Sequence, residues 1–77
     1  MIDWREHIER NPQIMVGKPV IKGTRITVEL ILEDLSAGCD VPEILRRYPR
    51  LREADVLASL AYAAEVTHQQ AMTNATA

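Results

Sequence analysis

The spacing of hydrophobic residues changes near residue 28, from a pattern of short strands to a pattern of helices. Between residues 11 and 27, turn-forming Asn, Pro and Gly separate short β-branched pieces, which predicts three very short strands at 14–16, 20–22 and 25–27. Strands of about three residues do not form a stable hairpin on their own. We therefore expect this small β element to pack on helices or to pair across a dimer.

Two amphipathic helices are expected after this element, over 28–37 and 41–48. In each segment, hydrophobic residues recur at positions i, i+3, i+4 and i+7, which places them on one helical face. Thr27 and Asp40 are suited to cap the two N-termini, because their side-chain oxygens accept from the first free backbone N–H groups. Pro49 ends the second helix, since the residue before a proline is pushed out of the α region.

A third helix is expected over 53–66, with a broad stripe of small and aliphatic residues. We expect the core to be contacted by Leu57, Leu60, Ala61 and Ala64, with Val56 and Ala63 beside them. The positions expected to face outward are Glu53, Asp55, Ala58, Ser59, Tyr62 and Glu65. Residues 67–77 are mostly small and polar, so a flexible tail is expected there.

The sequence thus predicts one mainly α domain over 1–66, with a small N-terminal β element and a trihelical, homeodomain-like helix-turn-helix core. The length of 77 residues leaves room for one hydrophobic core with a thin stability margin. Cys39 is the single cysteine and forms no disulfide within the chain, so a homodimer is the expected supplement. The candidate dimer-interface residues are Trp4, Ile14, Val16, Val20, Ile21 and Leu30.

Composition and spacing exclude several functional classes. No apolar run approaches the length that a membrane span needs, and charged residues occupy the N-terminus, so a cytoplasmic protein without a membrane partner is expected. His7, His68 and Cys39 match no metal-ligand spacing. No spacing indicates a pair of nucleophile and base. We therefore expect no enzymatic activity, no cofactor, no metal and no small-molecule substrate.

The net charge is −2, but the charges are segregated along the chain. Two stretches contain bases and no acids, and their candidate DNA- or partner-binding residues are Lys18, Lys22 and Arg25 in the first, and Arg46, Arg47, Arg50 and Arg52 in the second. The second group flanks the turn before the third helix, where a helix-turn-helix protein meets the DNA backbone. A patch that docks on an acidic protein and a solvated face are the alternatives.

Three features bear on what the basic residues can bind. The third helix, over 53–66, contains no Arg, Lys, Asn or Gln, so direct reading of base edges by this helix is not expected. Arg25 also suits a structural role, because a guanidinium group can fix a turn by bonding backbone carbonyls or an acid such as Glu29. The glycines at 17 and 23 do not have the spacing of a phosphate-binding loop.

The segment Gly-Lys-Pro-Val-Ile-Lys-Gly-Thr-Arg-Ile at 17–26, with Tyr-Pro-Arg-Leu at 48–51 and Ala-Tyr-Ala-Ala at 61–64, carries a family resemblance. Over roughly residues 4–66 the chain resembles the bacterial domain-of-unknown-function family numbered 433. The resemblance implies a small, cytosolic, homeodomain-like helix-turn-helix protein that tends to be dimeric. Members of this family are commonly classed as antitoxins, often encoded beside a PIN-like nuclease toxin.

The leading hypothesis from these observations is a dimeric, non-enzymatic antitoxin that binds and restrains a PIN-like toxin nuclease. Contact with operator DNA through the two basic groups is compatible with this hypothesis. The alternative is a stand-alone regulator that binds double-stranded DNA. A dimeric scaffold with neither activity is the third reading.

Overall fold

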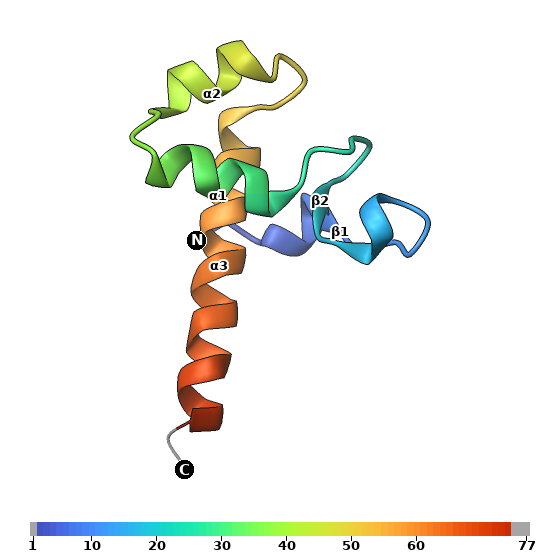
Figure 1. Cartoon of the computed structure of the whole chain (residues 1–77), viewed down its shortest axis with the longest axis vertical. Coiled ribbons are helices and arrows are strands. Elements are labelled where there is room, and N and C mark those ends of the chain that lie inside the picture. Colours follow the sequence, from blue (N-terminus) through green and yellow to red (C-terminus); the bar gives the residue numbers. More distant parts are fainter. Residues whose placement is uncertain (1, 75–77) are drawn as a thin grey trace.

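The computed structural model describes residues 2–74 of the chain, which form three α-helices, two short 3₁₀ helices and a two-stranded sheet (Figure 1). In chain order the elements are η1 (Trp4–Glu6), β1 (Ile8–Glu9), η2 (Met15–Gly17), β2 (Val20–Ile21), α1 (Val28–Ser36), α2 (Val41–Arg47) and α3 (Glu53–Asn74). This architecture confirms the expected fold class, a mainly helical domain with a small β element near the N-terminus. Helices α2 and α3, joined by residues 48–52, form the helix-turn-helix unit.

The sheet pairs β1 with β2 antiparallel, so that Ile8 lies opposite Ile21. The strand β1 was not expected from the sequence. The expected strand at 14–16 is wrong, because this segment forms the tight turn η2, closed by local backbone hydrogen bonds such as Gly17 N to Ile14 O at 3.0 Å. The expected strand at 25–27 is reduced to one isolated bridge, between Val20 and Thr27.

The helix termini follow the capping chemistry of the sequence. Thr27 Oγ1 accepts from the backbone N–H of Leu30 at 3.1 Å, and Asp40 Oδ1 accepts from Glu43 N at 2.9 Å. Both caps are confirmed. Helix α2 ends at Arg47, one residue before its expected end, because Tyr48 precedes Pro49 and adopts φ −125° and ψ 81°.

The hydrophobic core lies where the three helices meet the sheet. Its buried members are Ile8, Ile21, Val28, Ile31, Ile44, Leu51, Val56 and Ala58. Ile31 of α1, Ile44 of α2 and Val56 of α3 are at most 1 % exposed, so one large side chain from each helix closes the centre.

The face of α3 that contacts the core differs from the expected one. Ala58 and Ser59 were expected to face outward but are fully buried, whereas Leu57 and Leu60 were expected in the core and are 46 % and 45 % exposed. The reason is that α3 carries apolar or small residues around most of its circumference. Periodicity alone therefore does not select the side that packs.

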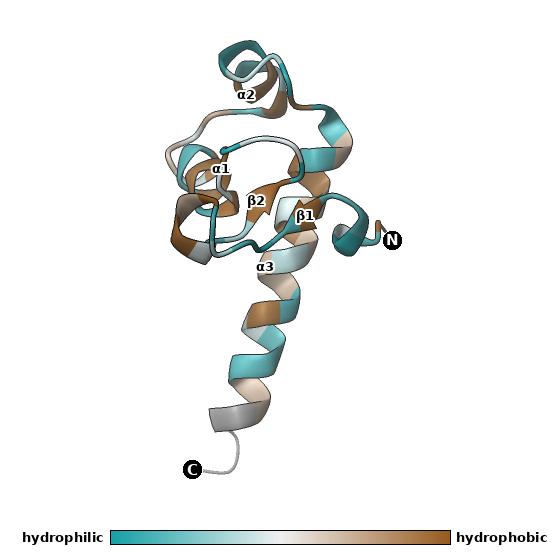
Figure 2. Cartoon of the chain, turned by 90° about the vertical axis from the view of Figure 1, so that its right-hand side faces the viewer, coloured by the Kyte–Doolittle hydropathy of each residue, from teal (hydrophilic) through white to brown (hydrophobic). Residues whose placement is uncertain are grey.

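Helix α3 also extends well past its expected end at residue 66. Residues 67–74 continue the helix, and the last part of the expected tail, 75–77, lies outside the described residues. No Gly or Pro interrupts 67–74, and Thr67 Oγ1 donates to Ala63 O at 2.8 Å. Figures 1 and 2 show this end of α3 projecting away from the other elements.

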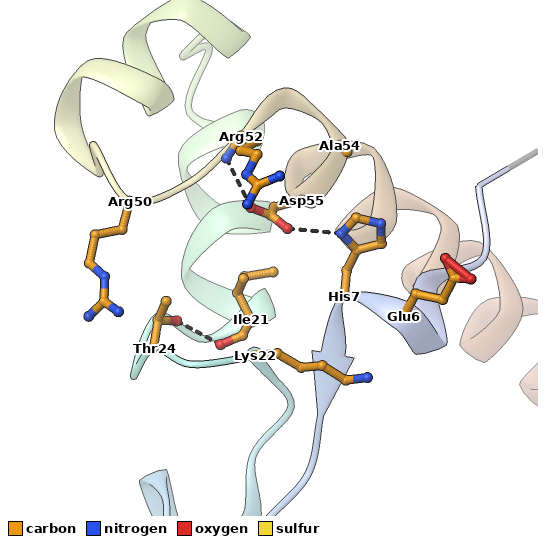
Figure 3. Close-up of a pocket in the computed structure, with 9 residues that line it drawn as sticks. All are labelled: Glu6, His7, Ile21, Lys22, Thr24, Arg50, Arg52, Ala54 and Asp55. Carbon is orange, nitrogen blue, oxygen red and sulfur yellow. Dashed lines mark hydrogen bonds and ion pairs between the residues drawn. The ribbon is translucent and has the colours of Figure 1, made fainter.

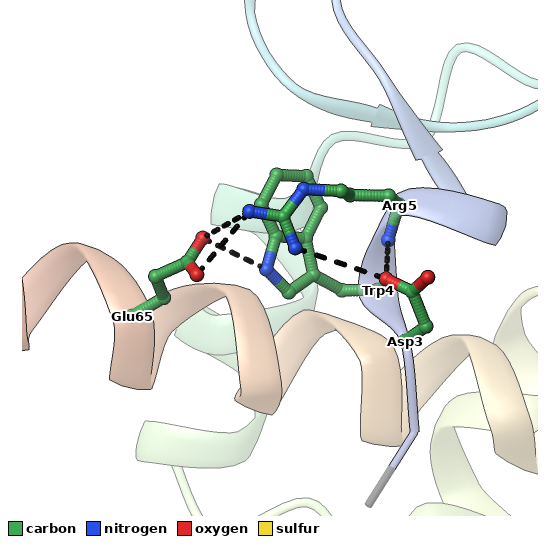
Figure 4. Close-up of polar contacts among 4 residues, drawn as sticks. All are labelled: Asp3, Trp4, Arg5 and Glu65. Atoms are coloured by element: carbon green, nitrogen blue, oxygen red, sulfur yellow. Dashed lines mark hydrogen bonds and ion pairs between the residues drawn. The ribbon is translucent and has the colours of Figure 1, made fainter.

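The N-terminal segment is attached to the middle of α3 by one aromatic and polar cluster (Figure 4). The Trp4 ring meets Tyr62 edge to face, with centroids 4.8 Å apart, and Trp4 Nε1 donates to Glu65 Oε2 at 3.1 Å. The Arg5 guanidinium lies 4.5 Å from the centroid of the Trp4 ring and 3.3 Å from the same carboxylate.

None of the helices in the described residues is both long and apolar enough for a membrane span.

Candidate functional site

The two basic stretches of the sequence meet in space. The Arg50 Nη2 atom, in the loop between α2 and α3, donates to the carbonyl oxygen of Gly23, in the turn between β2 and α1, at 2.9 Å. This bond brings the two loops together, and their exposed cations form what we call the basic patch: Lys22, Arg25, Arg50 and Arg52.

The turn between β2 and α1 owes its shape to Gly23 and Thr24. Gly23 has φ +77°, a left-handed conformation that glycine adopts at low cost. Thr24 Oγ1 donates to Ile21 O at 2.8 Å and accepts from Ile26 N at 3.0 Å. These bonds occupy the threonine hydroxyl in the turn, so its role at the patch is to position Lys22 and its neighbours.

The loop between α2 and α3 is held by a buried residue between two exposed arginines. Leu51 is buried in the core, so Arg50 and Arg52 on either side of it are left in solvent. Asp55 Oδ2 accepts from the backbone N–H of Arg52 at 2.9 Å, which gives this N–H group, just before α3, a hydrogen-bond partner. Asp55 Oδ1 lies 3.0 Å from His7 Nδ1, which connects the same turn to the residue before β1.

Three cations of the patch border a cavity of about 340 Å³ (Figure 3). Its lining residues are Glu6, His7, Ile21, Lys22, Thr24, Arg50, Arg52, Ala54 and Asp55. A second, neighbouring hollow is bordered by Arg25 and Arg50. The cavity and the hollow share Thr24 and Arg50, so they adjoin each other. Their guanidinium groups suit phosphate or carboxylate groups, while the carboxylates of Glu6 and Asp55 also line the cavity.

The other basic candidates from the sequence lie outside this patch. Lys18 Nζ is 3.2 Å from Glu29 Oε1, and Arg47 Nη1 is 3.0 Å from Asp34 Oδ1, so an acid on α1 compensates each charge. The Asp34 carboxylate raises the pKa of Arg47 above its ordinary value. Arg46 is exposed on α2 and borders neither the cavity nor the hollow.

The expected dimer-interface residues are divided by their burial. Val20 and Ile21 are buried in the chain's own core, so their side chains offer little surface to a second copy. Trp4 and Ile14 are half-buried, and Trp4 is engaged by α3 as described above. Two expected interface residues are exposed, namely Val16 at 88 % and Leu30 at 37 %.

Sequence reasoning missed His7, Glu6 and Asp55 as neighbours of the basic residues. His7 and Asp55 are far apart in the chain and meet because η1 and β1 pack on α3. Strand β1 is two residues long, too short to give a periodic signal. The position of Asp55, three residues after Arg52 at a helix start, was the one available sign, since acids there accept from the N-cap backbone.

The chain is a small domain of three helices and a minimal sheet, in which α2 and α3 form a helix-turn-helix arrangement and cations are concentrated before α3. A family model described as "Protein of unknown function (DUF433)" matches residues 8–63, and the chain belongs to this family.

The chain is also similar to a solved structure, the 2.00 Å crystal structure of a DUF433 member protein from Anabaena variabilis ATCC 29413. The TM-score is 0.75 and the sequence identity 29 %, over 80 % of this chain and 61 % of that one. The similarity thus spans about three fifths of that relative. None of the curated proteins matches the chain.

Proposed function

We propose that this protein is a non-enzymatic, antitoxin-like binding protein whose basic patch docks on the active site of a PIN-like nuclease in the cytoplasm. The observation that carries the proposal is the Arg50–Gly23 bond, which holds the loop that carries Arg50 and Arg52 against the turn that carries Lys22 and Arg25. Within residues 2–74 none of these four cations forms an ion pair with an acid, so their charge is available to a partner.

The electrostatics favour a partner that presents carboxylates. A nuclease that holds divalent metal ions does so with a group of Asp and Glu side chains. Guanidinium groups bind carboxylates in a bidentate geometry, and the patch contributes three of them. Complementary potentials speed association and fix the orientation of the two proteins.

Contact with the phosphate backbone of DNA is the second candidate function. The patch lies at the turn before α3, which is where a helix-turn-helix protein contacts DNA. The outward face at the start of α3 presents Glu53, Leu57 and Leu60. These side chains do not donate hydrogen bonds to base edges, so this binding mode would be weakly selective and strongly dependent on salt.

Co-expression with the product of the neighbouring gene, assayed for nuclease activity, tests the first proposal. We expect the two proteins to elute together from size exclusion and the nuclease to be inhibited in the complex. Arg52→Glu should abolish both effects, whereas Arg46→Glu, which makes the same charge change outside the patch, should leave them intact. Absence of a complex, or equal losses for the two variants, would contradict the proposal.

A binding assay with DNA separates the second candidate from the first. If the patch contacts phosphates, the affinity for the protein's own promoter fragment should fall with salt with a slope of about 0.9 per phosphate contacted. Arg52→Glu should lower this slope, and Arg46→Glu should not. A promoter fragment bound no better than random duplex would leave no role as a regulator that selects its own operator.

A further inference from the structure

Helix α3 has a second, mostly apolar face, opposite the face that packs on the core. The side chains on this second face are Leu57, Leu60, Ala64, His68 and Ala71, and all five are exposed. Ala58 and Ser59, which lie on the other side of the helix, are fully buried. We call these five exposed residues the α3 stripe.

Little of the stripe is covered by the chain itself. Its last part lies on the projecting end of α3, where Figures 1 and 2 show no other element alongside the helix. A groove lined by Ile2, Trp4 and Ala61 runs beside Ala64 and adds apolar surface to the stripe. Exposed leucines and an adjoining apolar groove on a projecting helix are typical of a protein interface.

We propose that the α3 stripe is a homodimer interface in which two copies of α3 pack antiparallel about a two-fold axis at Ala64. The spacing of the stripe supports this partner, because successive members are separated by three, four, four and three residues. This order reads the same in both directions from Ala64. A two-fold interface requires such self-complementarity, because the same surface is used twice.

The sizes of the side chains fit the antiparallel arrangement. The two-fold axis at Ala64 sets Leu57 of one copy opposite Ala71 of the other and brings the two Ala64 methyl groups together. Leu57 thus faces a small residue, while Leu60 of one copy lies opposite His68 of the other, so close approach of the two helices depends on Ala64 and Ala71. In a parallel pair Leu57 would face Leu57 and Ala71 would face Ala71, which leaves the far end of the contact poorly filled.

The charges also favour the antiparallel arrangement. All the acids of α3 lie in its first thirteen residues, at Glu53, Asp55 and Glu65, and the segment 66–74 contains no Asp, Glu, Lys or Arg. An antiparallel pair places the acidic start of each helix beside the uncharged end of the other. A parallel pair would set Glu53 beside Glu53, and like charges at close range repel.

The arrangement fixes the positions of the two basic patches. Glu53 follows the patch directly, and eleven residues separate it from the axis at Ala64. At 1.5 Å per residue the two helix starts lie about 33 Å apart along the helix axis. The dimer therefore presents two patches at opposite ends rather than one shared surface.

Sedimentation and engineered disulfides test the proposal with the full chain. We expect the wild-type chain to sediment at twice its monomer mass at micromolar concentration. Leu60→Glu should give a folded monomer with a dissociation constant raised at least about 100-fold, since each substitution occurs twice in the interface. Leu30→Glu, an exposed leucine on α1, is the matched control and should leave the dimer intact.

The orientation is tested in a Cys39→Ala background. Ala64→Cys alone should form a disulfide between copies, and a mixture of Leu57→Cys and Ala71→Cys chains should cross-link with each other. Leu57→Cys alone should not cross-link. A wild-type monomer, a dimer lost with Leu30→Glu but not Leu60→Glu, or cross-linking of Leu57→Cys with itself would each overturn the proposal. The result does not depend on what the basic patch binds.

Discussion

The Arg50 guanidinium donates to the backbone oxygen of Gly23 across 2.9 Å, and this bond joins the turn before α1 to the loop before α3. The two residues are 27 positions apart in the chain. Their contact brings the loop that carries Arg50 and Arg52 against the turn that carries Lys22 and Arg25.

Removal of this bond should affect both stability and binding. For Arg50→Ala we expect a loss of about 0.5–1.5 kcal/mol in the free energy of unfolding, because the bond is exposed to water. Retention on a heparin column should fall by more than for Arg46→Ala, which removes the same charge outside the patch. Equal retention of the two variants would show that the patch is not a preferred anion site.

Gly23 should resist substitution for a conformational reason alone. A Cβ at this position meets no atom within 4 Å, so the cost of Gly23→Ala arises from its φ of +77°. We expect a loss of about 1 kcal/mol in the free energy of unfolding. Gly23→Asn should cost less, because asparagine tolerates the left-handed region. Chemical denaturation of both variants measures the difference.

Neighbouring residues on α1 should respond very differently to truncation. Ile31 is fully buried between the helices, so Ile31→Ala should lose about 2–5 kcal/mol of stability through lost contacts and a cavity. Leu30 is 37 % exposed, and Leu30→Ala should cost clearly less. Thermal denaturation followed by circular dichroism checks the order. A larger effect at Leu30 would mean that α1 is rotated from the described orientation.

The single tryptophan reports on the attachment of the N-terminal segment. Trp4 donates to Glu65 and packs edge to face on Tyr62. For Tyr62→Leu we expect the fluorescence emission of Trp4 to shift to longer wavelength, because the indole becomes more exposed to water. Glu65→Gln keeps an acceptor for the indole N–H and should shift the emission less than Glu65→Ala. Identical spectra for all variants would show that Trp4 is not held there.

Alkaline pH should destabilise the protein through Tyr48. Burial, with a further contribution from the nearby Asp34 carboxylate, raises the pKa of Tyr48 above its ordinary value of 10.0. The folded state then holds this proton more tightly than the unfolded state, so stability is full below pH 10 and falls as the pH rises above it. Denaturation midpoints between pH 8 and 11 should fall less steeply for Tyr48→Phe than for the wild type.

Local chemistry in the sequence was enough to predict where the helices begin and which residues cap α1 and α2. Thr27 and Asp40 cap α1 and α2 as expected, because capping depends on residues three positions apart. The β element could not be located in the same way. Ile8 and Glu9 acquire their partners from β2, twelve or so residues later, and the turn around Gly17 satisfies its own backbone groups.

The sequence by itself determined that the chain forms three helices and carries seven of its nine Lys and Arg residues in two groups. Only the tertiary structure decided which cations lie near one another and which side of α3 is buried. Asp34 and Glu29 neutralise Arg47 and Lys18, while Arg50 lies against Gly23. The charge compensation depends on packing between distant segments, because it is set by neighbours in space. The buried side of α3 depends on packing as well, because the helical period repeats equally on either apolar face of this helix.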